Sequence, residues 1–271
     1  MSITPLKQTW FVAKTVLIEA IRRKEIYIVI LAALGLSWWV FSIDFFNLEG
    51  ISKFQREIVL QVMNIAVALT VIALGACQLP REFANKTIYP LMAKPVSRPT
   101  FLIGKALGVW LAGIFVMLMF TIIFYAGNWY LGTMPNNGLY LQHFWLQMVQ
   151  CTILIALSFI LSLIINLDAA IVLSFLFWFL SGTMLSAMTI IYPMSGAIGK
   201  FLMKVFVFVL PQLSLFDLSA KIIHSDYKPE TNTWVWPPLE ATTMAELTLY
   251  GFVYTAIFIT IAYILFRRKP L

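Results

Sequence analysis

Long apolar runs alternate with short polar segments along most of the chain. A helix needs about 20 apolar residues to cross a bilayer, and four runs meet this length once each: Ile26–Phe46, Ile58–Leu79, Phe101–Leu131 and Leu247–Phe266. A fifth run, Phe144–Tyr192, would reach about 73 Å as one helix, more than twice the bilayer core. We divide it at Asn166-Leu167-Asp168 into 144–165 and 169–192, and so predict six membrane-spanning helices.

The segment before the first run predicts an amphipathic helix over residues 4–24. Lys7, Lys14 and Arg22 fall on one half of its helical wheel, and Ala13 and Val16 are among the apolar residues on the other half. A helix with this pattern lies in the membrane interface. We therefore expect it to lie along the bilayer surface, with Trp10 at headgroup depth.

The segment between the last two spans, residues 193–246, is the longest one outside the predicted membrane helices. Ala197–Leu210 is apolar except for Lys200 and Lys204. Two lysines near the centre of a spanning helix would cost about 5–7 kcal/mol, so we predict a re-entrant or interfacial helix there. A polar loop follows, with Trp234 and Trp236 as interface anchors.

The composition fixes the fold class. Apolar residues make up 61% of the 271 residues and charged residues 11%, whereas a soluble domain has about 45–50% and about 25%. The chain is therefore predicted to be an all-α integral membrane protein. With six spans and both termini inside, the inner side holds 13 basic and 4 acidic residues and the outer side 6 basic and 8 acidic ones, which satisfies the positive-inside rule.

Several kinds of chemistry have no support in the sequence. The predicted spans carry almost no ionisable residue, which argues against a proton-coupled carrier. His143 and His224 lie in no metal-ligand motif, so we predict no metal site. Gly104-Lys105-Ala106 lacks the Ser or Thr that ends a P-loop. We therefore expect the chain to bind no ATP and no other cofactor by itself.

Neutral polar residues remain inside the spans. They can join helices by hydrogen bonds or line a translocation path, and the sequence leaves both readings open. Gln147 and Gln150 lie in the fourth span. Our candidates for the path are Gln61, Asn64, Thr70, Ser174 and Ser181. In the third span, Gly104, Gly108 and Ala112 form a stripe of small residues that lets another helix approach closely.

The loop over residues 81–98, between the second and third spans, is basic and rich in proline. Pro80 is predicted to end the second span, and Pro90 confines any following helix to about residues 81–89. The loop also has apolar residues, which a simple tether would not need. It is therefore predicted to be a rigid elbow that docks on a soluble partner.

The residues of this loop resemble a signature of the ABC-2 permease family, the membrane subunits of ABC transporters with the type V exporter fold. The matching stretches are Glu82-Phe83, Lys86-Thr87-Ile88, Leu91–Arg98 and Phe101–Lys105. The resemblance implies that the loop is a coupling helix seated in a separate ATPase subunit, which holds the ATP and Mg²⁺. The residues at that interface would be Arg81, Glu82, Phe83, Lys86, Thr87, Ile88, Leu91 and Lys94. Arg98 and Lys105 would meet lipid headgroups.

The same resemblance implies a multi-pass protein of the bacterial cytoplasmic membrane that is not itself an enzyme. Its partners would be the ATPase subunit, a second permease copy and membrane lipids, with no nucleic acid. We expect a transporter, and specifically an exporter. The alternatives are a membrane anchor or scaffold without transport, and a small secondary carrier or channel.

Overall fold

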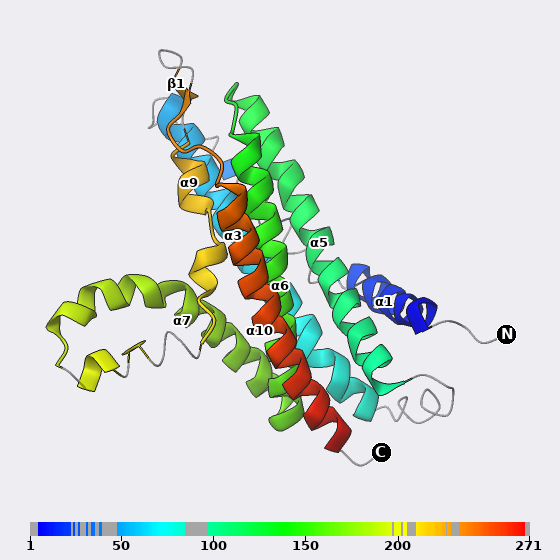
Figure 1. Cartoon of the computed structure of the whole chain (residues 1–271). Helices are drawn as coiled ribbons and strands as arrows, with labels where there is room; N and C mark the ends of the chain where they lie inside the picture. Colours follow the sequence, from blue (N-terminus) through cyan, green and yellow to red (C-terminus); the bar gives the residue numbers. More distant parts are fainter. Residues whose placement is uncertain are drawn as a thin grey trace.

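The computed structural model of the chain is predominantly helical (Figure 1). It describes residues 5–22, 24, 27, 31, 34, 35, 38, 39, 48–84, 97–196, 198–201, 203, 204, 210–225, 227, 228 and 233–268. Most of the predicted first span, residues 26–46, and most of the loop over residues 81–98 lie outside these residues.

Four long helices run side by side and form the body of the molecule (Figure 1). They are α3 (Leu48–Ala84), α5 (Arg98–Tyr130), α6 (Asn137–Ile164) and α10 (Ala241–Arg268). Among the described residues, these are the helices long and apolar enough to cross a membrane. The helix α7 (Leu167–Met194) starts in the bundle, and its apolar part Leu167–Thr183 is shorter.

Each of these helices extends beyond the apolar run that predicted it. The helix α5 has 33 residues and is therefore about 50 Å long, against about 30 Å for a bilayer core. It starts at Arg98 because the side chain of Ser97 accepts a hydrogen bond from the Thr100 backbone N–H, and proline is tolerated in a first turn. Between α6 and α7 the chain makes a break at Ile165 and Asn166, so the 49-residue apolar run contains two helices.

The prediction that Pro80 ends the second span is wrong, because α3 continues through Pro80 to Ala84. Proline removes one backbone donor from a helix, but packing on both sides of Pro80 holds the chain in place. Leu79 is fully buried, and the ring of Phe83 lies 5.9 Å from that of Phe266 in α10. Arg81–Ala84 thus form the last turn of α3.

The core of the protein lies between α3, α5 and α6. The helix α6 contacts α3, α5, α7 and α10, so it occupies the centre of the bundle. Large rings fill the space between α5 and α6: Phe124 stacks on Tyr140 with 4.6 Å between ring centroids. Close packing of such rings holds helices together in a bilayer, where the lipid is as apolar as the protein interior.

The helix α1 (Pro5–Ile21) packs across α5 on the stripe of small residues (Figure 1). A Cβ atom added to Gly108 would lie 2.5 Å from the Cβ of Val16, and one added to Gly104 would lie 2.9 Å from the Cβ of Val12. The glycines are therefore needed for the close approach of α1. The amphipathic N-terminal helix is the partner of the small-residue stripe, which the sequence alone did not identify.

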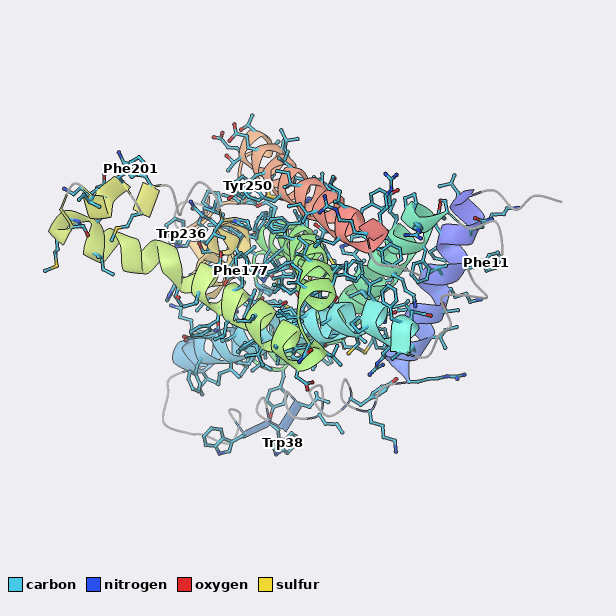
Figure 2. The ribbon with its side chains drawn as sticks, turned by 90° about the horizontal axis from the view of Figure 1, so that it is seen from below. Phe11, Trp38, Phe177, Phe201, Trp236 and Tyr250 are labelled. Carbon is cyan, nitrogen blue, oxygen red and sulfur yellow. The ribbon has the colours of Figure 1, made fainter. Side chains whose placement is uncertain are left out.

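The second half of α7 leaves the bundle, and the chain then returns to cover its upper end (Figure 1). Ile198–Phe201, Met203 and Lys204 are helical, and the rest of the predicted re-entrant segment lies outside the described residues. In Figure 2, Phe201 and Phe11 of α1 lie at opposite edges of the molecule.

The returning chain forms a short 3-10 helix η1 (Leu213–Phe216), the helix α9 (Ser219–Ile223) and a small hairpin. The hairpin pairs β1 (Tyr227–Lys228) with β2 (Thr233–Trp234) in antiparallel register. This pair is a small departure from the predicted all-α class, in a segment that we expected to be a loop.

Candidate functional site

One end of the bundle collects basic side chains, and we call it the basic end. It is the end where α3 and α10 finish and α5 begins, and it carries Arg81, Arg98, Arg267 and Arg268 (Figure 1). The predicted elbow over residues 81–98 starts and finishes here, because Arg81 lies in the last turn of α3 and Arg98 is the first residue of α5.

A buried ion pair joins α3 to α5 close to the basic end. The Nζ atom of Lys105 donates a hydrogen bond to Oε1 of Glu82 at 2.7 Å and another to Oε1 of Gln78 at 3.0 Å. Glu82 and Gln78 are one turn apart, so they lie on the same face of α3. The side chains of Lys105 and Glu82 are only 9% and 19% exposed. Hydrogen bonds between charged groups are short and strong, so this pair fixes the two helices to each other.

Lys105 therefore does not occupy the position that we expected for it. The resemblance placed it at the lipid headgroups, whereas its side chain points into the protein and pairs with Glu82. The reason is that α5 is apolar on nearly all sides, so its sequence gives no sign of which face meets α3. A buried lysine needs an acceptor, and Glu82 and Gln78 supply two.

Two further polar contacts hold the neighbouring helices at the basic end. Arg81 at the end of α3 pairs with Glu19 of α1, with 3.0 Å between Nη1 and Oε1. Arg98 donates a hydrogen bond of 3.1 Å to the carbonyl oxygen of Arg267 in α10. Both contacts are exposed, so each contributes less than the buried pair.

The end of α10 also packs on both helices that flank the elbow. The ring of Phe266 is fully buried and lies 5.9 Å from Phe83 of α3 and 6.2 Å from Phe101 of α5. The guanidinium of Arg98 lies 6.0 Å from the centre of the Phe266 ring, within reach of a cation–π contact. Thus α1, α3, α5 and α10 are all connected where the elbow begins and ends.

The predicted ATPase-facing residues fall into two groups. Arg81, Glu82 and Phe83 belong to the last turn of α3 and make the contacts given above. The others lie outside the described residues: Lys86, Thr87, Ile88, Leu91 and Lys94.

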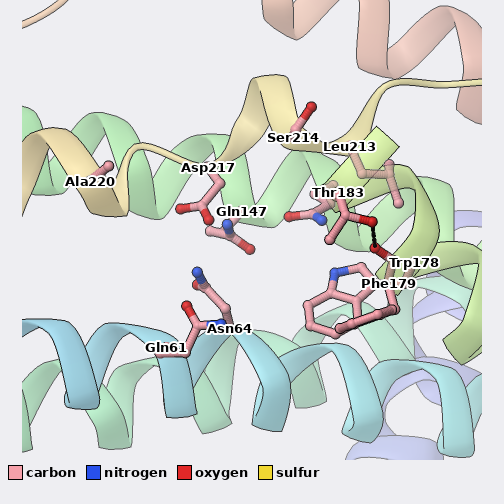
Figure 3. A pocket seen from close by; sticks show the side chains of 12 residues that line it. Gln61, Asn64, Gln147, Trp178, Phe179, Thr183, Leu213, Ser214, Asp217 and Ala220 are labelled. Carbon is pink, nitrogen blue, oxygen red and sulfur yellow. Dashed lines mark hydrogen bonds between the residues drawn. The ribbon is translucent and has the colours of Figure 1, made fainter. Parts of the chain in front are cut away.

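A cavity with amide, hydroxyl and carboxylate groups in its lining lies farther along the bundle, between α3, α6, α7 and the returning segment with η1 and α9. Its volume is about 270 Å³. Figure 3 shows Gln61 and Asn64 of α3 pointing across it toward Gln147 and Asp217. The lining residues are Gln61, Asn64, Gln147, Gln150, Trp178, Phe179, Gly182, Thr183, Leu213, Ser214, Asp217 and Ala220.

Hydrogen bonds hold the wall of this cavity that the returning segment forms. Nδ2 of Asn64 donates to Oγ of Ser219 at 3.1 Å, and both the backbone N–H and the hydroxyl of Ser219 donate to Oδ1 of Asp217. Behind them, Nδ1 of the fully buried His143 accepts a hydrogen bond of 3.2 Å from the Leu218 backbone N–H. A nitrogen that accepts carries no proton, so the 3.9 Å contact of His143 with Asp217 is not an ion pair.

Two of the five candidate path residues, Gln61 and Asn64, line the cavity. Ser181 instead anchors the returning chain: its Oγ donates to the Pro211 carbonyl at 2.6 Å and accepts from the Leu213 N–H at 3.0 Å. Ser174 is fully buried and Thr70 half-buried, and neither belongs to the lining.

The candidate path did not include Gln147, Gln150, Trp178 or Asp217, which also line the cavity. Gln147 and Gln150 could have been chosen, because their spacing of three residues puts two amides on one face of a helix. Nothing in the sequence brings Asp217 beside Asn64, since the two are far apart in the chain. Among the described residues, no three His, Cys, Asp or Glu side chains lie close enough together to hold a metal ion.

Comparison with known proteins identifies the family. A family model described as "ABC-2 family transporter protein" matches residues 10–271, nearly the whole chain. None of the curated proteins compared with the chain matches it. The family match covers the bundle, the basic end and the cavity together, and it agrees with the resemblance found in the elbow residues. The chain therefore belongs to the ABC-2 family of transporter proteins.

Proposed function

We propose that this protein is the permease subunit of an ATP-driven ABC exporter in the bacterial cytoplasmic membrane. It binds no ATP itself and couples to a separate ATPase subunit through residues 81–98. Six spans cross the membrane, and both termini are cytoplasmic. Members of this family normally work with ABC ATPase subunits, which supports a partner of this kind.

The observation that carries this proposal is the buried contact between Lys105 and Glu82. It joins α3 and α5 next to the points where the elbow leaves one helix and enters the other. A force applied to the elbow would then act on both helices together, because their ends cannot separate without exposing a buried charge. Phe266 extends this connection to α10.

The charge distribution supports the proposed orientation. Arg81, Arg98, Arg267 and Arg268 lie at the basic end, and the positive-inside rule assigns such an end to the cytoplasm. An ATPase subunit needs ATP and therefore meets the protein on this side. The cavity lies toward the opposite end, where a substrate path would open to the outside.

The proposed second permease copy and the surrounding lipid would meet the apolar outer faces of α7 and α10. Both helices expose large apolar side chains, for example Leu173 and Leu180 in α7 and Leu249 and Phe252 in α10. Exposed apolar area of this kind needs lipid or protein to cover it. These residues are compatible with either neighbour.

Co-purification and ATP hydrolysis test the proposal. A tagged copy, expressed with the candidate ATPase subunit, should retain that subunit and stimulate its ATP hydrolysis in proteoliposomes. Lys86→Glu combined with Lys94→Glu should abolish both effects, whereas Lys221→Glu in α9 is the matched control and should not. Retention of the ATPase by the double variant would contradict the role of the elbow. Transport without any ATPase would favour a secondary carrier.

A further inference from the structure

The described lining of the cavity contains hydrogen-bond acceptors that have no donor. Among the described residues that line it, Asp217 is the only charged one, and its side chain is 40% exposed. The amide oxygens of Asn64 and Gln150 are buried and accept no hydrogen bond from any residue that the structure describes. The charge and both unused amide atoms therefore favour a ligand that is positive and donates hydrogen bonds.

The free acceptor of Asn64 is fixed by its neighbours. The carboxylate of Asp217 can only accept, so the single hydroxyl proton of Ser219 is directed to it. The Ser219 oxygen must then accept from Asn64, and the Asn64 atom facing it must be the NH₂ group. Exchanging the positions of the Asn64 amide oxygen and nitrogen would break this series of hydrogen bonds. Consequently Oδ1 of Asn64, a residue that is only 7% exposed, is the atom left without a partner.

Apolar surface accompanies these acceptors. Figure 3 shows the indole of Trp178 at one end of the cavity, beside Phe179 and opposite Leu213. Aromatic faces attract cations as well as apolar groups. The volume of about 270 Å³ lies just below the range of about 300–1,000 Å³ typical of sites for whole drug-sized ligands. The cavity therefore suits a small head group with a short apolar part.

We propose that this cavity binds a protonated amine. The ammonium group pairs with the exposed Asp217 carboxylate, and a small rotation of the Asn64 side chain uncovers its Oδ1 as a second acceptor. The adjoining carbon atoms lie against Trp178. A neutral alcohol can donate one hydrogen bond to Asp217 but has no positive charge to pair with the carboxylate, and a quaternary ammonium has no N–H for Asn64. That this amine belongs to the transported substrate rests on the proposed function, whereas the binding itself does not.

Calorimetry on the full chain in phosphatidylcholine nanodiscs tests the proposal, with empty nanodiscs as reference. The probes are hexylammonium, hexyltrimethylammonium and hexanol. We expect hexylammonium to bind at least tenfold more tightly than the other two. Asp217→Asn should weaken its binding at least tenfold, and Asp168→Asn, the same change at the exposed start of α7, should leave it unchanged.

A second pair of variants keeps the test informative if Asp217→Asn disturbs the fold. Gln61 is exposed on the cavity wall, so its replacement should not affect packing. Gln61→Lys should weaken hexylammonium binding about tenfold and Gln61→Glu should strengthen it about threefold, by charge alone. Equal binding of hexanol, or no effect of either Gln61 variant, would overturn the proposal.

Two sources of the amine are distinguished by the lipid. If the natural ligand is the head group of phosphatidylethanolamine, adding this lipid to the nanodiscs should weaken hexylammonium binding at least fivefold in the wild type. If the ligand is a soluble amine, this lipid should have no effect. The experiment contains no ATPase, so a failure to bind amines leaves the proposed coupling untouched, and a failure of coupling leaves amine binding untouched.

Discussion

The basic end and the cavity both hold carboxamide side chains between packed helices, but these amides have different partners. At the basic end, Gln78 accepts a hydrogen bond from Lys105, which is also paired with Glu82. In the cavity, the amide oxygens of Asn64 and Gln150 have no partner among the described residues. A buried acceptor without a partner costs about 1–3 kcal/mol. The basic end is thus built to hold one geometry, and the cavity keeps polar atoms available for a ligand.

The largest effect should come from breaking the buried pair at the basic end. Glu82→Ala leaves the Lys105 charge without its carboxylate, so we expect a loss of about 3 kcal/mol in the free energy of unfolding. Denaturant titration in detergent micelles measures this loss. Exchange of the two residues, Glu82→Lys with Lys105→Glu, should recover most of it. A loss below about 0.5 kcal/mol for Glu82→Ala, as for an exposed pair, would contradict the assignment.

Replacement of glycine by valine tests how closely the helices pack at the α1–α5 contact and at the cavity wall. A side chain at Gly108 meets Val16 and the Ala13 carbonyl oxygen of α1, so Gly108→Val should destabilise the protein by about 2 kcal/mol. At Gly182, on the cavity wall, no atom lies within 4 Å of the added Cβ. Gly182→Val should therefore be neutral in the same titration. No loss for Gly108→Val would show that α1 does not pack closely on α5.

A matched pair of glutamine variants compares the amides directly. Gln78→Met removes a hydrogen bond to the charged Lys105 and should cost about 1.5 kcal/mol. Gln150→Met removes a buried amide oxygen that has no partner among the described residues, so it should not destabilise the protein and should raise the free energy of unfolding by up to about 1–3 kcal/mol. The reverse order would mean that the cavity, and not the basic end, is the fixed region.

The smallest effect should come from the exposed pair at the basic end. The side chains of Arg81 and Glu19 are 47% and 44% exposed, so Arg81→Gln should cost at most about 0.5 kcal/mol. Added salt should reduce even this difference, because the pair is open to screening. An effect as large as that of Glu82→Ala, unchanged by salt, would show that this contact is buried in the working protein.

Local features of the sequence predicted the helical membrane class and the division of the long apolar run. The length of the run required two helices, and the polar residues Asn166 and Asp168 mark the only break. The small-residue stripe of Gly104 and Gly108 likewise predicted a close helix contact. The sequence did not identify α1 as the partner of this stripe, because small residues predict a close helix contact without indicating which helix makes it.

Features that depend on contacts between distant segments were predicted wrongly or not at all. Pro80 was expected to end a helix, but Phe83 packs on Phe266 from the far end of the chain. Lys105 was expected at the headgroups, because nothing in the apolar α5 indicates that Glu82 faces it. Only part of the cavity lining was predicted, for a similar reason. Asn64 lies in the predicted span α3, whereas Asp217 reaches the cavity only because the chain folds back over the bundle.

Chemical crosslinking to the ATPase subunit tests the central claim, that this subunit docks on the elbow at the basic end. The buried cysteines Cys77 and Cys151 are first replaced by alanine. Single cysteines are then introduced at Lys86, at Lys94 and at Trp129, which is 87% exposed at the other end of α5. We predict crosslinks to the ATPase from positions 86 and 94, and none from position 129. A crosslink from position 129 with none from the elbow would contradict the account.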